Sequence, residues 1–399
     1  MQRLPMCLVG CGGMGARHLR GYQALERVGR RNIELVAVCD LDPAAAERLA
    51  TEAAETLGVR PKVHSGIAAV IDDLDVAALD IVTDPVTHHS LAVPALQAGK
   101  HVISEKPLAL TPRTSRAMIA AADKGKATLA TAENYRRGNG SRVARAVLDA
   151  GLIGPLHLMV DSHLGGSDRV IITPWRHDRL RGSIALDMGV HLTDMVQYLL
   201  GDIESVHGRG LIAEPVRRAP DGTAVTATGE DSLLAQLVTS SGVTVQLGYL
   251  PSGPGQSYFQ RTVHGRLGSM RLPADRSGGP VVVYRADCTL QGEELLAELG
   301  GSPVDRLGAD LFGSSSAEYQ LEFAESDAAH LAIELHDFAD AVLTGRSPDV
   351  DGVSGLNALA AVYAVYESQL LGRAVRVADV ASGALHASSA DIDEALGVA

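Results

Sequence analysis

The sequence lacks any long apolar run. Among its 399 residues, no stretch approaches the roughly 20 consecutive apolar residues that a membrane-spanning helix needs. The N-terminus passes from Met1 directly into a strand-like pattern, without the charged stretch, apolar core and cleavage site of a secretory signal peptide. We therefore expect a cytoplasmic protein that neither crosses nor binds a membrane.

Cysteine is also scarce, and the four cysteines show no spacing typical of a metal or redox site. Cys7, Cys11 and Cys39 lie in or beside apolar strand-like runs, where cysteine usually acts as a small buried hydrophobe. We expect these three and Cys288 to be reduced and structural, which suits a cytoplasmic protein.

Positive charge is limited, since 35 Lys and Arg face 48 Asp and Glu, giving a net charge of −13. No basic run is longer than a pair, which argues against a nucleic-acid partner. A hydrophobic fraction of 46% with 21% charged residues is typical of a well-packed globular protein. The length predicts two domains.

The first part of the chain, residues 1–132, alternates short apolar runs with segments of helical period. Continuous apolar strands separated by helices indicate a parallel sheet that is covered on both faces. The expected strands are Leu4–Val9, Ile33–Cys39, Ala78–Thr83 and His101–Ser104, and the expected helices include Ala16–Val28 and Pro43–Leu57.

The second part, residues 133–375, has longer strands that follow one another without intervening helices, which predicts an open, largely antiparallel sheet. These strands are Leu156–Leu164, Val206–Ile212, Ser232–Thr239, Val243–Leu250 and Ser257–His264. Residues 326–345 and 354–371 have a helical pattern, and the Gly-, Ser- and Pro-rich stretch 251–302 is expected to be looped. Residues 376–399 form a tail, with a short helix or a frayed end from about Ala378.

A glycine turn follows the first strand. Residues Gly10–Gly15 match G-x-G-x-x-G between a strand and a helix, with Gly10, Gly12 and Gly15 at the glycine positions and Gly13 and Met14 between them. The first glycine permits the tight turn, the second lets backbone approach a pyrophosphate, and the third lets the helix pack on the strand. The turn predicts dinucleotide binding, although FAD or S-adenosylmethionine would also use it.

Asp40 ends the second strand, where a carboxylate can bind the ribose hydroxyls of NAD and repel the 2′-phosphate of NADP. Asp40 would alternatively serve as the cap of the next helix. Together, the turn and the acid favour NAD over NADP.

A charged pair followed by proline, Glu105-Lys106-Pro107, ends another short strand. Because ligands bind at the carboxyl edge of a parallel sheet, Lys106 is expected close to the cofactor. Such a pair in isolation would more often be a solvated surface pair.

The segment 187–198 places four polar residues within about 60° on one face of a helix: Asp187, His191, Asp194 and Tyr198. An imidazole titrates near neutral pH, and a carboxylate one turn away can orient it for proton transfer. A solvated polar face and a zinc site are the alternatives, but no further ligand with recognisable spacing supports zinc, so no metal is expected.

These motifs, in this order, resemble the Gfo/Idh/MocA oxidoreductases, the family of glucose–fructose oxidoreductase and inositol dehydrogenase. The resemblance covers residues 4 to about 375. It depends on the glycine turn, on Pro85 with His89, on Ala98-Gly99-Lys100 leading to Glu105-Lys106-Pro107, on Trp175-Arg176 and on Asp187-x-Gly189-x-His191-x-x-Asp194.

The resemblance implies an α/β fold: an N-terminal Rossmann domain with a doubly wound parallel sheet, then an α/β domain whose open sheet forms homodimers or homotetramers. It implies Lys106, Asp187 and His191 as catalytic residues. It further implies Asp84, Pro85, His89, Glu105 and Lys106 at the cofactor and Tyr135, Trp175, Arg176, Asp187 and His191 at the substrate. Asp84 departs from the family's small residue before the proline, and Gly182-Ser183-Ile184 replaces a run of glycines.

The implied activity is hydride transfer between NAD and a secondary hydroxyl of a sugar, sugar derivative or cyclitol. Some relatives instead oxidise transiently, eliminate and reduce again, so that a glycoside is cleaved without net redox change. A non-catalytic NAD- or sugar-sensing regulator is the third hypothesis. The presence of both Lys106 and His191 weighs against it, because a sensor does not need that pair.

Overall fold

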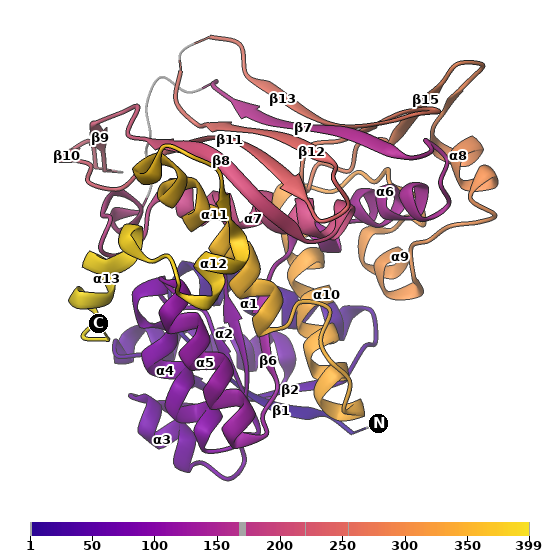
Figure 1. Cartoon of the computed structure of the whole chain (residues 1–399). Coiled ribbons are helices and arrows are strands. Elements are labelled where there is room, and N and C mark those ends of the chain that lie inside the picture. Colours follow the sequence, from indigo (N-terminus) through magenta and orange to yellow (C-terminus); the bar gives the residue numbers. More distant parts are fainter. Residues whose placement is uncertain (1, 167–172, 220, 254, 399) are drawn as a thin grey trace.

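The computed structural model describes residues 2–166, 173–219, 221–253 and 255–398, and it contains two main sheets, one above the other in Figure 1. The N-terminal sheet has six parallel strands in the order β3-β2-β1-β4-β5-β6. Their bounds are β1 Leu4–Val9, β2 Ile33–Cys39, β3 Lys62–His64, β4 Ala78–Ile81, β5 His101–Glu105 and β6 Leu129–Ala132. The strand order reverses between β1 and β4, which is where open α/β sheets bind ligands.

Helices cover both faces of this sheet, as expected. In β1, Met6 and Leu8 pack toward α1 and α2, whereas Cys7 and Val9 pack toward α3, α4 and α5. This alternation follows from the period of two residues in a strand. The helix bounds are α1 Gly13–Arg27, α2 Pro43–Leu57, α3 Ile67–Asp72, α4 Pro85–Gln97 and α5 Pro112–Gly125.

The second sheet has nine strands in the order β16-β15-β14-β13-β7-β12-β11-β8-β17. Strands β7 and β12 pair in parallel, and the other neighbouring pairs described for this sheet are antiparallel, so the expected largely antiparallel sheet is confirmed. The bounds are β7 Leu156–Leu164, β8 Ile203–Leu211, β11 Ser232–Thr239, β12 Thr244–Leu250, β13 Tyr258–Gly265, β14 Gly268–Leu272, β15 Val282–Arg285, β16 Thr289–Leu290 and β17 Val375–Arg376. A separate hairpin joins β9 Val216–Arg218 to β10 Ala224–Thr226.

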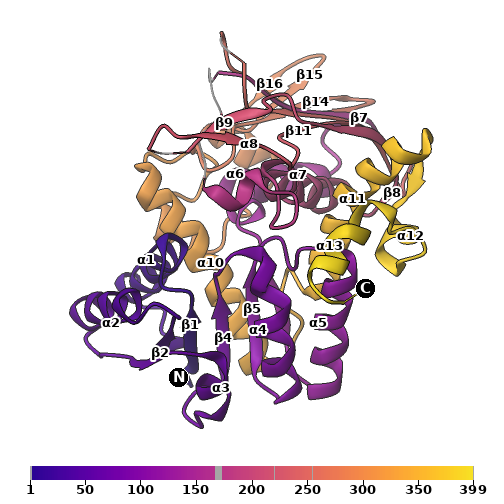
Figure 2. The same cartoon turned by 90° about the vertical axis from the view of Figure 1, so that its left-hand side faces the viewer.

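Two helices, α7 Ile184–Leu200 and α11 Gly352–Leu371, lie under the second sheet on the side of the N-terminal part (Figure 2). The N-cap of α7 is Ser183, whose side chain accepts a hydrogen bond from the backbone N–H of Leu186 at 3.0 Å. Its apolar stripe, including Leu192 and Met195, is buried in the core beneath the sheet. This packing leaves the polar residues of α7 to face the N-terminal part. Helix α6 Asn139–Asp149 also contacts α7.

One long helix from the second half, α10 Phe323–Thr344, packs on α1 of the N-terminal part. Leu335 and Phe338 share a core with Leu8, and α9 Arg306–Phe312 contributes to the same core. The close approach is permitted by Gly21, because a Cβ there would lie 3.2 Å from the Cβ of Leu331. The domain limits 1–132, 133–375 and 376–399 stay a sequence-based prediction.

The expectation of a looped stretch at 251–302 was wrong. Besides β13, which the sequence predicted as Ser257–His264, the stretch contains β14 to β16 and α8 Gly292–Glu298. Met270 and Val283 are fully buried, but the glycines and prolines around these short strands obscure the alternation that would have indicated them.

The C-terminal tail is folded, as α12 Val377–Ser382, η3 Ala387–Ser389 and α13 Ala390–Ala395. Ile392 is buried, and Thr111 donates a hydrogen bond to Asp393 at 2.6 Å. The expected short helix was therefore present, but it is anchored rather than frayed.

Cys7, Cys11 and Cys39 are buried, and all four cysteines are free. None of the helices in the described ranges is long and apolar enough to cross a membrane.

Candidate active site

A cavity of about 660 Å³ opens where the carboxyl ends of the N-terminal strands meet α7. It brings together residues from both parts of the chain, as the sequence motifs predict. The sequence-predicted residues that line it are Gly10, Gly12, Gly13, Met14, Asp40, Asp84, Pro85, Glu105, Lys106, Tyr135, Trp175, Arg176, Asp187 and His191. Gly15 and His89 are not among its lining residues.

The glycine turn between β1 and α1 has the geometry that each of its positions requires. Gly10 has φ +106°, a conformation that side chains disfavour. A Cβ on Gly12 or Gly13 would meet nothing within 4 Å, so backbone there is open to a ligand. A Cβ on Gly15 would lie 2.1 Å from the carbonyl oxygen of Gly10, so Gly15 serves the packing of helix on strand.

Asp40 follows β2 and lies beside the glycine turn. One carboxylate oxygen accepts the backbone N–H of Cys11 at 2.6 Å, and the other accepts that of Asp42 at 2.9 Å. The cap of α2 is Asp42, which accepts the N–H of Ala44. Asp40 is thus held against the cavity and is not the cap of the next helix.

The loop after β4 carries Asp84. Its carboxylate lies 2.7 Å from the guanidinium of Arg181, which belongs to the second part of the chain. The histidine that organises this loop is His88, whose ring nitrogens lie 3.0 Å from the carbonyl oxygens of Thr83 and Pro107. The expectation that His89 contacts the cofactor is therefore unsupported by its position. Its neighbour His88 ties this loop to the one after Lys106.

Lys106 and Asp187 form the central ion pair. The Nζ of Lys106 lies 2.6 Å from Oδ1 of Asp187 and 3.0 Å from its carbonyl oxygen. The Nε of Arg176 lies 2.8 Å from Oδ2. Burial would raise the pKa of Asp187, but the two cations hold it well below its usual range. One carboxylate therefore faces two cations, which leaves net positive charge at Lys106.

His191 is oriented by a residue that the sequence motifs did not indicate. Its Nδ1 lies 2.6 Å from Oε1 of Glu133, which directly follows β6 Leu129–Ala132. Tyr135 stacks flat on the imidazole, with ring centroids 3.9 Å apart. Burial lowers the pKa of His191 well below its ordinary value and raises the pKa of Glu133 to about 7. The imidazole is thus neutral near pH 7.

The expectation that Asp187, His191, Asp194 and Tyr198 form one proton-transfer face was wrong in part. Asp194 pairs with Arg136, whose guanidinium also lies over the ring of Tyr198. Side chains on one helix face diverge at their tips, so each finds a different partner. The carboxylate that orients His191 is therefore Glu133 and neither aspartate of the helix.

Trp175 and Arg176 lie on η2 Pro174–His177 at the cavity wall, as expected. The Arg176 guanidinium lies 4.3 Å from the Trp175 ring centroid, a cation–π arrangement. The tryptophan thus fixes the cation that binds Asp187.

Beneath Lys106 lies a buried chain of polar groups. The ring of His18 lies 2.9 Å from Asp80 and 3.2 Å from Glu105, and Tyr22 donates to Asp80 at 3.0 Å. The other oxygen of Glu105 accepts the backbone N–H of Lys106 at 2.9 Å. The chain therefore holds the backbone that carries the lysine.

Within the described ranges, His18, Glu105 and Glu334 lie close enough together to hold a metal ion. Both nitrogens of His18 already face carboxylates, so a metal would have to displace an existing contact. We assign the group a structural role.

The positions of Glu133 and His18 in the sequence could have indicated that both lie near the site. Glu133 follows a strand at the same carboxyl edge as Lys106, and His18 comes one turn after Gly15 on α1. A residue after a short strand is noticeable in the sequence only with a marker such as the proline after Lys106, and Glu133 has none. Its partner His191 is 58 residues away in sequence.

The parallel sheet carries the glycine turn at its switch point and Lys106 at its carboxyl edge, and His191 on α7 faces them across the cavity. This arrangement is typical of two-part, nucleotide-dependent oxidoreductases. Residues 4–133 match the model described as the oxidoreductase family with an NAD-binding Rossmann fold, and residues 141–271 match the GFO/IDH/MocA C-terminal domain. The chain belongs to the Gfo/Idh/MocA family and is an NAD-binding oxidoreductase.

Relatives are similar along nearly the whole chain. D-apiose dehydrogenase of Paraburkholderia graminis is 28% identical over 94% of this chain and 90% of its own length. Myo-inositol 2-dehydrogenase of Thermotoga maritima is 26% identical over 94% of this chain and 98% of its own. The crystal structure of an NAD-binding oxidoreductase from Klebsiella pneumoniae superposes with a TM-score of 0.80 at 23% identity, covering 94% and 99% of the two chains. This last similarity shows the shared fold.

Proposed function

We propose that the chain is an NAD-dependent dehydrogenase that acts on a secondary hydroxyl of a sugar, sugar derivative or cyclitol. The observation that carries this proposal is the placement of the Lys106–Asp187 pair and neutral His191 in the cavity that the glycine turn lines. The relatives named for D-apiose and myo-inositol support a polyhydroxylated substrate.

The residues present fit the dinucleotide. The open backbone at Gly12 and Gly13, at the start of α1, would hold the pyrophosphate. Asp40, already fixed by two backbone N–H groups, would bind the ribose hydroxyls and disfavour a 2′-phosphate. Pro85 and Asp84 would line the nicotinamide end. When bound there, NAD supplies the hydride acceptor.

The proton chemistry follows from His191 and Lys106. With its Nδ1–H donated to the Glu133 carboxylate, His191 presents a bare Nε2, which would accept the hydroxyl proton of the substrate. The Lys106 ammonium would donate a hydrogen bond to the same oxygen and stabilise its developing negative charge. Asp187 positions that ammonium and Arg176 holds Asp187.

The test is a panel of sugars, glycosides and cyclitols assayed for NADH formation, with Lys106→Met as the key variant. We expect the variant to bind NAD with near wild-type affinity and to lose most of its turnover. The matched control is Lys124→Met, which removes an exposed lysine on α5. Near-normal turnover in Lys106→Met would overturn the proposal, as would a panel in which wild type oxidises nothing.

The cytoplasmic location and the homodimeric or homotetrameric assembly through the second sheet remain proposals. The shared family and the long open sheet with nine strands support the assembly.

A further inference from the structure

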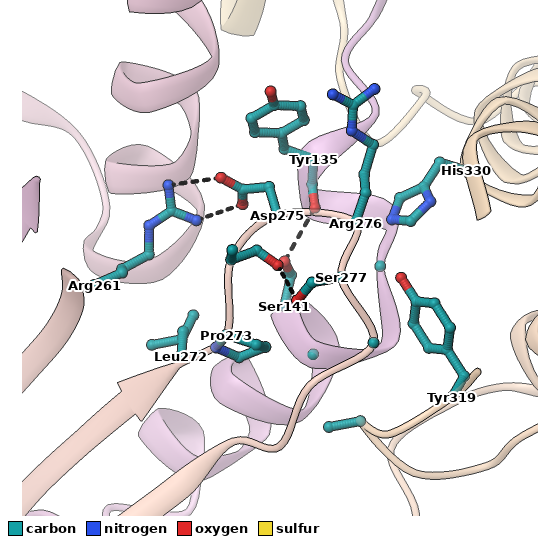
Figure 3. A pocket seen from close by; sticks show the side chains of 15 residues that line it. Tyr135, Ser141, Arg261, Leu272, Pro273, Asp275, Arg276, Ser277, Tyr319 and His330 are labelled. Carbon is teal, nitrogen blue, oxygen red and sulfur yellow. Dashed lines mark hydrogen bonds and ion pairs between the residues drawn. The ribbon is translucent and has the colours of Figure 1, made fainter. Parts of the chain in front are cut away.

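Arg276 lines the active-site cavity and has an unusual backbone conformation. It follows β14 in a loop and has φ +62°, which non-glycine residues rarely adopt and which costs energy. Its guanidinium lies 5.2 Å from the ring centroid of Tyr135 and 5.0 Å from that of Phe323. Figure 3 draws a neighbouring pocket that Arg276 and Tyr135 also line, and it shows the Arg276 side chain running from the loop past the Tyr135 ring. The strain and the two rings fix one cation in place.

The positive charge of Arg276 is incompletely balanced. Asp327 binds Arg17 through both carboxylate oxygens, at 2.8 and 2.5 Å. Arg276 has only one contact with that carboxylate, at 3.2 Å, on an oxygen that Arg17 already uses. Its Nε is buried without a hydrogen-bond partner in the described part of the chain. One carboxylate thus serves two guanidinium groups.

The neighbouring acid is committed elsewhere. Asp275 binds Arg261 through both oxygens, at 2.5 and 3.1 Å, and Figure 3 shows this pair directed away from Arg276.

The other acids of the cavity wall also have partners. Asp84 pairs with Arg181, and Asp187 pairs with two cations. Glu105 is bound to His18, and Asp40 accepts two backbone N–H groups beside the glycine turn. In the described part of the wall none of these four acids pairs with Arg276, so its carboxylate contact is the one to Asp327, which it shares with Arg17.

We propose that Arg276 binds a carboxylate of the substrate, so that the hydroxyl oxidised belongs to a sugar acid or a similar polyhydroxy carboxylate. This inference rests on the proposed dehydrogenase function and names its substrate class. A planar guanidinium matches a carboxylate through two parallel hydrogen bonds. Because Arg276 shares Asp327 with Arg17, it retains N–H donors for a second carboxylate, and the phosphate arm of the test below distinguishes a phosphate ester.

Arg276 shares Asp327 with Arg17, which lies on α1 next to the glycine turn, so NADH affinity is measured below to separate substrate from cofactor. The ring contacts favour the substrate. Arg276 lies against Tyr135, and Tyr135 stacks on His191, the proposed base. A carboxylate on Arg276 would therefore anchor the same molecule whose hydroxyl faces His191.

The test uses matched pairs that differ in one group: D-glucose with D-glucuronate, D-galactose with D-galacturonate, and sorbitol with D-gluconate, plus D-glucose 6-phosphate as the phosphate arm. We expect kcat/KM for an acid to exceed that of its neutral partner by about 10²-fold, the upper range for hydrogen bonds to a charged group. In Arg276→Gln this preference should be lost through a higher KM for the acid. Arg276→Lys should restore part of it.

Arg285→Gln on β15 is the matched control, since it removes one partly exposed arginine outside the cavity and should leave the preference unchanged. Binding of NADH is measured on every variant. The inference is overturned if neutral sugars are oxidised as well as acids, if the phosphate is preferred, if Arg276→Gln keeps the preference, or if that variant loses NADH affinity instead. Those results leave the proposed function standing, whereas a failure to oxidise any member of the panel refutes the proposed function itself.

Discussion

The Nδ1 of His191 on α7 lies 2.6 Å from the carboxylate of Glu133, the residue that directly follows β6 of the N-terminal sheet. The flat stacking of Tyr135 on the imidazole leaves the ring little freedom to rotate. The pair therefore fixes which nitrogen of His191 faces the cavity. This relationship determines when the base is active.

The first prediction concerns the pH dependence of that pair. Burial raises the pKa of Glu133 to about 7. A protonated Glu133 donates its O–H to Nδ1 of His191, so Nδ1 must then be the nitrogen without hydrogen. The single N–H of the neutral imidazole is then on Nε2, which cannot accept the substrate's proton. The activity of the wild type should therefore fall as the pH drops through about 7.

Glu133→Gln should move this acid limb to lower pH, because a Gln oxygen still accepts the Nδ1–H but cannot be protonated in this range. Glu133→Ala should lower kcat by roughly 10²-fold. The readout is the pH profile of kcat/KM. An acid limb that stays at the same pH in Glu133→Gln would assign the titration to another group.

The second prediction concerns cofactor choice. Asp40→Ser removes the carboxylate that would bind the ribose and repel a 2′-phosphate. We expect the ratio of NAD to NADP affinity to fall by about 10- to 100-fold, mostly through weaker NAD binding. Fluorescence titration with NADH and NADPH measures both constants. An unchanged ratio would show that Asp40 only supports the glycine turn through Cys11.

The third prediction concerns the buried chain beneath Lys106. Burial lowers the pKa of His18, but the carboxylates of Asp80 and Glu105 raise it well above the ordinary value. His18→Ala would leave those carboxylates buried without their cation, which should cost about 3–5 kcal/mol of unfolding free energy.

Because the folded-state pKa of His18 is the higher one, its contribution to stability is complete below the unfolded-state value of about 6.5 and is lost as the pH rises through the folded-state value. The difference in unfolding free energy between wild type and His18→Ala should therefore shrink at alkaline pH. Urea unfolding at a series of pH values measures it. A difference that grows at alkaline pH would contradict a charged His18.

The fourth prediction concerns the tail. Ile392 on α13 is 3% exposed, so Ile392→Ala should lower the unfolding free energy by about 2–4 kcal/mol. The control is Val353→Ala, which truncates a half-exposed side chain on α11 and should change it by under about 1 kcal/mol. Equal effects would indicate that the tail does not contribute to the core.

Many of the strands and helices could be predicted from the sequence, because apolar runs indicate buried strands and capping residues indicate helix ends. Leu4–Val9, Ser232–Thr239 and the helix Pro43–Leu57 have the expected bounds. The short strands around Met270 and Val283 were missed because turn residues interrupt their pattern.

The site was predictable to the extent that it depends on local motifs. The glycine turn, Lys106 and the helix with Asp187 and His191 were found this way. The partner of His191 was not, because only the packing of α7 against η1 Tyr135–Arg137, just after β6, brings Glu133 to it. Nor could the sequence indicate that α10 completes the N-terminal core.

The most direct test of the account is a double-mutant cycle on Lys106 and His191, measured as kcat/KM with any substrate the panel identifies. If both groups act on one hydroxyl oxygen in one transition state, Lys106→Met, His191→Asn and the double variant should be similarly slow. Additive losses, with the double variant slower by the product of the two single effects, would contradict that joint role.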